Sequence, residues 1–266
     1  MADPVTLKTL RDRKRAGVKI PMLTCYDATT ARWLARGGVD VLLVGDSAAQ
    51  MIFGHDDTRY ADLDLLIALT AAVRRGAGDA FIVGDLPFGS YHRDGGQAVE
   101  NACRMMTEGT ASAVKIEVDG RFESVVERLD RANVPVVAHV GWRPQRHART
   151  GVPVVAGRGH EQAEALAETT RRLVGAGAVM VLLEQATDAA AEAVVEAVDV
   201  PVIGCGAGPA CDGHVVVLHD WLGLSEWQPR FAAPATRGGD ALADLARRWC
   251  EEVTEGRYLA GGSPYG

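Results

Sequence analysis

Short runs of apolar residues recur along the chain, and several of them end at a carboxylate. The run 41–44 stops at a glycine and is followed by Asp46 and Ser47, and two later runs end at Asp85 and Glu117. An apolar run without a polar break is typical of a strand that is buried on both faces, as in a parallel sheet. Because barrel strands carry the chemistry at their carboxyl ends, this pattern predicts three carboxylates on one rim.

Seven clear apolar runs alternate with helical patterns, and an eighth strand is ambiguous. The clear runs are 18–25, 40–47, 81–85, 113–117, 136–140, 178–184 and 200–206. The eighth is either a weak sixth strand at 152–156, which contains Pro153, or a last strand at 215–218 that replaces it. Strict alternation of strands and helices indicates parallel strands, and eight of them predict an α/β fold of the (β/α)8 TIM barrel type.

The length of 266 residues suits one such barrel. We find no linker and no low-complexity segment, so we expect a single domain over 1–266 with a helical C-terminal extension from about residue 225. Within that extension, residues 240–253 form an amphipathic pattern. We expect this helix to cover the barrel or a neighbouring subunit.

Composition excludes several classes of protein. A net charge of −7 without a Lys/Arg block argues against a nucleic-acid surface. No apolar run approaches the roughly 18 residues of a membrane helix, and the N-terminus lacks the apolar segment of a signal peptide. Five irregularly spaced cysteines fit neither a disulfide framework nor a zinc site. We therefore expect a cytoplasmic protein that acts on small molecules, with neither nucleic acid nor membrane as a partner.

Asp46, Asp85 and Glu117 are candidate metal ligands. Carboxylate oxygens are hard ligands, and Mg²⁺ takes a few of them while it keeps positions for water or substrate. Each acid by itself could instead cap the helix that follows its strand, where Asp is common. Three acids on three successive strands favour the metal site.

Lys115, His139 and Glu184 are candidates for the remaining chemistry. Lys115 lies two residues before Glu117, so both side chains point to the same face of their strand, and a lysine inside a barrel needs an anionic partner. His139 lies near the end of a strand, where a satisfied core histidine is also common. Glu184 ends an apolar run, where a carboxylate is either paired or has a raised pKa that suits proton transfer. We favour Glu184 as the general base; a fourth metal ligand and a rim ion pair are the alternatives.

Several stretches of the chain resemble the ketopantoate hydroxymethyltransferase (3-methyl-2-oxobutanoate hydroxymethyltransferase) family. They are TCYD at 24–27, VLLVGDS at 41–47, GHD at 54–56, AAVRRGA at 71–77, DLPF at 85–88, VKIE at 114–117, AHVG at 138–141, AGRG at 156–159, LLE at 182–184 and, above all, PVIGCGAGPACDGHVVVLHD at 201–220. The resemblance runs from about residue 7 to residue 231, and the combination of motifs is specific.

The resemblance implies a barrel of the phosphoenolpyruvate/pyruvate superfamily type and a homo-oligomer, usually a decamer. It implies that Mg²⁺ is held by Asp46 and Asp85, with Glu117 completing the acidic site, and that Glu184 is the base. It also implies that the 2-oxo acid is held by Asp46, Ser47, Asp85, Lys115 and His139. The last two would also act in catalysis by stabilising negative charge on oxygen.

The implied reaction is Mg²⁺-dependent hydroxymethyl transfer from 5,10-methylenetetrahydrofolate, the co-substrate, to the enolate of 3-methyl-2-oxobutanoate. The product is 2-dehydropantoate (ketopantoate), in pantothenate biosynthesis. The loops 48–62 and 142–152 depart from the family pattern; Trp142 and Arg143 stand where the family usually has Leu and Thr. Three alternatives stay open: a paralogous hydroxymethyltransferase or aldolase with another 2-oxo acid or one-carbon donor in specialised metabolism, a C–C lyase or mutase of the wider superfamily, and a binding protein without turnover.

Overall fold

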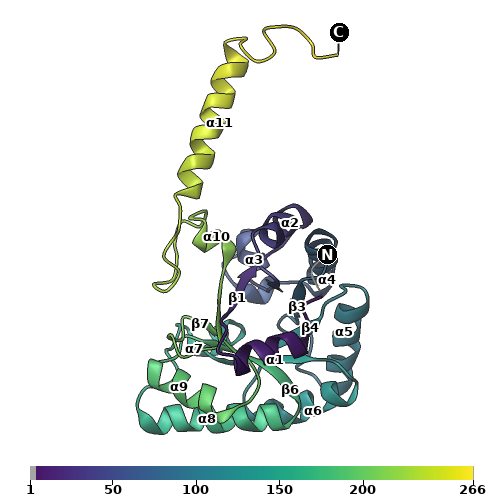
Figure 1. Cartoon of the computed structure of the whole chain (residues 1–266), viewed down its shortest axis with the longest axis vertical. Coiled ribbons are helices and arrows are strands. Elements are labelled where there is room, and N and C mark those ends of the chain that lie inside the picture. The colour runs from purple at the N-terminus through teal and green to yellow at the C-terminus, as the bar shows by residue number, and fades with distance from the viewer. Residues whose placement is uncertain (1–3, 266) are drawn as a thin grey trace. The chain divides into compact units, whose positions relative to one another are not determined.

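A closed barrel of eight parallel strands forms the centre of the computed structural model, which describes residues 4–265 (Figure 1). The strands are β1 Ile20–Thr24, β2 Val41–Val44, β3 Phe81–Asp85, β4 Ala113–Glu117, β5 Val136–Gly141, β6 Ala178–Glu184, β7 Val202–Cys205 and β8 Gly213–Val216. They pair in sequence order, and β8 pairs with β1 to close the barrel. The predicted (β/α)8 fold is confirmed.

Of the two candidates for the eighth strand, the later one in the sequence is the barrel strand. The segment 152–156 is not a barrel strand; it forms only an isolated bridge between Ala156 and Ala186. Val152 and Val154 are 60% and 49% exposed, whereas a barrel strand buries its side chains on both faces. The strand observed is β8, Gly213–Val216, which overlaps the alternative predicted at 215–218; no helix separates it from β7, so strict alternation fails at this connection.

Helices fill most of the other connections and surround the barrel. They are α2 Ala28–Arg36, α3 Ala48–Met51, α4 Leu63–Ala77, α5 Gly95–Thr107, α6 Glu123–Arg131, α7 His147–Thr150, α8 His160–Gly175 and α9 Asp188–Ala197, with 3₁₀ turns η1 Thr58–Tyr60, η2 Gly120–Phe122 and η3 Pro144–Arg146. A further helix, α1 Leu7–Arg15, precedes β1, and its Leu10 packs with the barrel interior. Several of them begin at an aspartate that accepts hydrogen bonds from backbone N–H groups, as Asp27, Asp62 and Asp94 do. Such caps satisfy donors that have no partner inside the helix.

The unbroken apolar runs arise because both faces of each strand are buried. Leu43 and Val83 pack with residues of neighbouring strands inside the barrel. Leu42 and Ile82, one residue earlier in each strand, pack against α2 and α4 on the outside. Since successive side chains of a strand point to opposite faces, a strand between two apolar layers needs apolar residues at every position.

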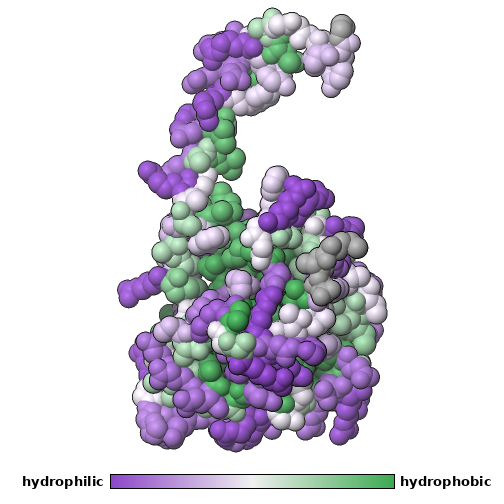
Figure 2. Space-filling model, viewed as in Figure 1, coloured by the Kyte–Doolittle hydropathy of each residue, from purple (hydrophilic) through white to green (hydrophobic). Residues whose placement is uncertain are grey.

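The chain divides into two compact units, Met1–Val217 and Leu218–Gly266. The second unit contains α10 Leu218–Trp221 and α11 Gly238–Thr254, so the helix predicted at 240–253 is present. Figure 2 shows hydrophobic residues along one side of α11. About half of the surface is exposed in each of the helix residues Leu242, Leu245, Trp249 and Val253. The single domain over 1–266 stays a prediction, as does the cover for this helix. Within residues 4–265, no helix is long and apolar enough to cross a membrane.

Candidate active site

Five consecutive strands bring the predicted site residues to one rim of the barrel. Asp46 follows β2, Asp85 ends β3 and Glu117 ends β4. His139 lies in β5 and Glu184 ends β6. Register places Asp85 beside Lys115 and Glu117 beside His139 in neighbouring strands. All of these residues except Glu184, whose side chain is 15% exposed, are buried.

Lys115 is held in its charged form by the carboxylates around it. Its Nζ lies 2.9 Å from Asp85 Oδ2 and 3.2 Å from His139 Nδ1. Burial by itself lowers the pKa of Lys115, but Asp85, Asp46 and Glu117 together carry that pKa above its usual value. The predicted anionic partner of this buried lysine is therefore Asp85.

His139 is neutral, and its tautomer follows from its neighbours. Burial, followed by the positive charges of Lys115 and Arg143, lowers the pKa of His139 well below its usual value. Because a charged Lys115 can only donate, His139 Nδ1 accepts and the ring proton is on Nε2. This Nε2 lies 3.2 Å from Glu184 Oε2 but forms no hydrogen bond with the described residues.

Glu184 has the properties of a proton acceptor at the mouth of the barrel. Burial raises its pKa to about 8, since the attraction of Lys115 is offset by the repulsion of Asp46 and Asp85. Gly141, with φ +86°, lets the backbone turn against Glu184; a Cβ there would lie 2.3 Å from the Glu184 carbonyl oxygen. Trp142 N donates to that oxygen at 2.8 Å, so β5 fixes the end of β6 at this residue.

The three carboxylates fit a hard cation by their chemistry. None of the described helices is capped by the side chain of Asp46, Asp85 or Glu117, so the capping alternative does not explain them. Burial raises the pKa of Asp85 to about 7 and that of Glu117 well above its usual value. Asp85 Oδ1 and Glu117 Oε1 are buried without a hydrogen-bond partner, which is costly unless a ligand satisfies them.

These acids do not form a preassembled metal cage. Within residues 4–265, no three His, Cys, Asp or Glu side chains are arranged as a ready metal site. Asp85 Oδ2 instead contacts Lys115 and accepts from the Asp46 N–H at 3.0 Å, and Glu117 Oε2 accepts from the Gln145 N–H at 3.0 Å. The metal assignment of Asp46, Asp85 and Glu117 thus stays a prediction.

Ser47 follows Asp46 directly in the chain, but its side chain contacts the loop after β1 and not the three acids. It starts α3 without capping it, and its Oγ lies 2.8 Å from the hydroxyl of Tyr26, which follows β1. The pair connects the loop after β2 to the loop after β1. A role for Ser47 in holding the 2-oxo acid is not tested by this contact.

Tyr91 and Gln145 support the acids from neighbouring loops, and the sequence reasoning missed both. The Tyr91 hydroxyl donates to Gln145 Oε1 at 2.7 Å and accepts from the Glu117 N–H at 3.0 Å. Gln145 Nε2 donates to Asp46 Oδ2 at 3.0 Å. Their position in the loops after β3 and β5 was the only available signal, because loops at this rim carry function.

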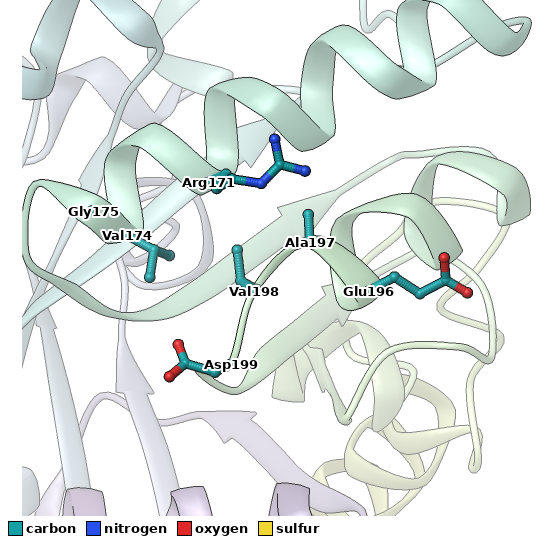
Figure 3. A pocket seen from close by; sticks show the side chains of 7 residues that line it. All are labelled: Arg171, Val174, Gly175, Glu196, Ala197, Val198 and Asp199. Carbon is teal, nitrogen blue, oxygen red and sulfur yellow. The ribbon is translucent and has the colours of Figure 1, made fainter.

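A separate cavity of about 520 Å³ lies between the C-terminal ends of α8 and α9, where no predicted site residue is found (Figure 3). Val174 and Val198 point into it, with Arg171, Glu196 and Asp199 around them. Because α9 leads into β7, this cavity belongs to the amino end of the strands. That end of a barrel serves stability, whereas chemistry lies at the carboxyl end.

Comparison with known proteins gives matches over nearly the whole chain. A sequence model described as ketopantoate hydroxymethyltransferase matches residues 4–260. The 3-methyl-2-oxobutanoate hydroxymethyltransferase of Thermobifida fusca is 43% identical over 254 residues, which cover 96% of this chain and 91% of that protein. The enzyme of the same name from Geotalea daltonii is 39% identical over 266 residues, the full length of both proteins.

Solved structures agree with the fold. A putative phosphonomutase from Burkholderia cenocepacia matches with a TM-score of 0.66 at 17% identity, over 91% of this chain and 97% of that one. A 2,3-dimethylmalate lyase, a member of the PEP mutase/isocitrate lyase superfamily, matches with a TM-score of 0.62 at 15% identity, over 95% and 89%. At such identities the likeness concerns the barrel alone.

Proposed function

Because the chain belongs to the ketopantoate hydroxymethyltransferase family, an enzyme family, we propose that it transfers a hydroxymethyl group to C3 of 3-methyl-2-oxobutanoate. In this proposal 5,10-methylenetetrahydrofolate is the donor, water supplies the hydroxyl oxygen, and the products are 2-dehydropantoate (ketopantoate) and tetrahydrofolate. The observation that supports it most is the row of Lys115, His139 and Glu184, which brings a cation, a neutral imidazole and a basic carboxylate to one rim.

Mg²⁺ is the metal of this proposal, with Asp46, Asp85 and Glu117 as the residues that would hold it. The support is the donor chemistry and the two buried oxygens of Asp85 and Glu117 that have no hydrogen-bond partner in the described chain. When bound, such an ion supplies positive charge to the oxygens of a 2-oxo acid and lowers the cost of an enolate.

The proton is moved by Glu184. Its carboxylate takes the C3 proton, and the electron pair of that C–H bond forms an enolate whose charge lies on the former ketone oxygen. The Lys115 ammonium and the His139 Nε2–H are donors for this charge, and burial makes them effective. Water adds to the methylene carbon of the carrier, and the two C–N bonds of that carbon break to leave tetrahydrofolate and formaldehyde. The enolate carbon attacks the formaldehyde carbon, and the formaldehyde oxygen takes a proton to become the new hydroxyl. Asp46, Ser47 and Asp85 complete the proposed contacts to the 2-oxo acid.

Proton NMR of 3-methyl-2-oxobutanoate in deuterated buffer with Mg²⁺ tests this function. We expect loss of the C3 proton signal with the enzyme alone and a new hydroxymethyl signal when 5,10-methylenetetrahydrofolate is added. Exchange without the new signal would keep the enolising site and reject this donor. If neither signal changes, the proposed reaction is wrong.

A paralogous hydroxymethyltransferase or aldolase, acting on another 2-oxo acid or donor in specialised metabolism, is the second candidate. Arg143, which departs from the family pattern, favours it, because its charge contributes to the low pKa of His139. It pairs with Asp119 at 3.0 Å. If several 2-oxo acids exchange their C3 protons and 3-methyl-2-oxobutanoate is the slowest, this candidate replaces the first.

The proposal includes a homo-oligomer, a decamer by family resemblance, in the cytoplasm, with a place in pantothenate biosynthesis. Light scattering of the purified protein measures the number of subunits. A monomer at micromolar concentration would reject the oligomer.

A further inference from the structure

A cavity of about 620 Å³ opens beside Glu117 and Gln145, within the usual size range of small-molecule sites. Five arginines line it: Arg93, Arg121, Arg143, Arg146 and Arg149. They come from the loops after β3, β4 and β5 and from α7. This concentration of positive charge lies directly against the acidic rim of the barrel.

The carboxylates near these arginines are too few to neutralise them. Asp94 pairs with Arg93 at 2.9 Å, and Asp119 accepts from Arg121 at 2.7 Å and from Arg143 at 3.0 Å, while Arg146 lies 3.9 Å from Asp119. Burial, followed by the charge of Arg143, lowers the pKa of Arg146. Arg149 forms no ion pair with any residue in the range 4–265. The arginine cavity therefore has unused capacity for an anion.

Aromatic side chains form another part of the same cavity. The rings of Phe88 and His92 have centroids 5.0 Å apart, and those of His92 and Phe122 are 5.8 Å apart and nearly perpendicular. Phe88 is 48% exposed, so its ring is available to a ligand. Aromatic faces and edges of this kind bind another aromatic ring.

We propose that the arginine cavity binds the aminobenzoyl-glutamate part of the one-carbon carrier, with further glutamates preferred. The inference rests on the proposed function. Guanidinium groups bind carboxylates through two parallel hydrogen bonds, which suits the glutamates, and the aromatic cluster suits the aminobenzoyl ring. Because Glu117 forms part of the same wall, a carrier bound in this way has its reactive end toward the acidic rim.

Equilibrium binding to the full chain, without 2-oxo acid, tests the cavity with three probes. The probes are tetrahydropteroate, which lacks glutamate, and tetrahydrofolate with one and with three glutamates. We expect the triglutamate to bind most tightly and Arg149→Gln to weaken it about tenfold, as for the loss of one charged hydrogen-bonded contact. Tetrahydropteroate should respond far less to this variant, and added salt should weaken the triglutamate most.

Matched variants separate charge from ring binding. Arg11→Gln, at an exposed position of α1, is the control for charge and should leave all three affinities as they are. Arg149→Lys should recover part of the lost affinity. Phe88→Ala should weaken all three probes, while Phe231→Ala, which removes a ring that is 40% exposed in the second unit, should weaken none.

The outcomes distinguish the cavity from the reaction. Equal affinity of the wild type for the three probes, or equal behaviour of Arg149→Gln and Arg11→Gln, overturns the cavity assignment even where proton exchange of the 2-oxo acid occurs. A fall in exchange as large as the fall in carrier affinity also overturns it, because Arg149 would then act on the rim. Absence of exchange in the wild type overturns the proposed function, whatever the cavity binds.

Discussion

At the scale of single residues, the site is a row of buried groups that set one another's charge. Asp85 keeps Lys115 charged, Lys115 fixes the tautomer of His139, and His139 turns its protonated nitrogen toward Glu184. A buried row of this kind is stable only as a whole, since removal of one partner leaves an uncompensated charge. Each member can therefore be tested by its effect on the next.

Replacing Glu184 by Gln should abolish proton exchange at C3 of the 2-oxo acid, by about 10²-fold or more, because the amide cannot accept the proton. Magnesium affinity should remain, since the proposed ligands are untouched. Exchange is followed by NMR and Mg²⁺ binding by calorimetry. Glu192→Gln, on the exposed side of α9, is the control. Unchanged exchange in the Glu184 variant would refute its role as base.

Replacing Tyr91 by Phe should reduce both stability and kcat. The variant loses the hydroxyl that joins Gln145 to the Glu117 backbone, and buried groups left without a partner cost about 1–3 kcal/mol each. Urea unfolding and steady-state kinetics measure the two effects. Tyr60→Phe removes a hydroxyl from a residue that is 63% exposed and should change neither. A purely structural Tyr91 would lower stability and leave kcat unchanged.

The acids and the lysine could be predicted because each ends or lies in an apolar run, where a charged residue has no packing reason to be. Tyr91 and Gln145 gave no such signal. Their partners come from strands or loops between 26 and 99 residues away in the sequence. Only the closed barrel brings these positions together.

At the scale of elements, the junction of β5 and β6 shapes the mouth of the site. Gly141→Ala should destabilise the protein by about 2 kcal/mol or more, because φ +86° disfavours a side chain and the new Cβ would clash with the Glu184 carbonyl. Gly151→Ala, at φ +71° with nothing within 4 Å, should cost only about 1 kcal/mol. Urea unfolding compares the two. Equal losses would show that the contact with Glu184 is unimportant.

The strands with two buried faces were predictable because apolar residues occupy most positions in them and the charged ones lie near their carboxyl ends. The last strand, β8, was only one of two candidates and was placed at 215–218, two residues late, because His214 is exposed and Gly213 has no side chain to bury. Gly213 instead lets β1 approach: a Cβ there would lie 2.1 Å from the Ile20 carbonyl oxygen. A strand specified by close backbone approach gives little hydrophobic signal.

At the scale of the whole molecule, the acidic site makes stability depend on pH. The pKa of Glu184 in the folded protein, about 8, lies above the value of 4.5 for an ordinary Glu. A raised pKa means that the folded state holds its proton longer than the unfolded state does. The contribution of Glu184 to the free energy of unfolding is therefore complete below about pH 4 and is lost as pH rises toward about 8.

The Glu184→Gln variant should therefore become more stable than the wild type as pH rises from about 5 to 8, in the absence of metal, by a margin on the order of 1 kcal/mol or more. Comparing the two proteins removes the contribution of His139, whose lowered pKa acts in the opposite direction below about pH 6.5 and is common to both. Urea midpoints at several pH values measure the margin, with Glu192→Gln as the reference for an exposed carboxylate. A constant margin across this range would mean that Glu184 ionises in the folded protein as it does in water. Burial would then add no free-energy cost to its ionised form, and Glu184 would lack the raised basicity that suits it to proton transfer.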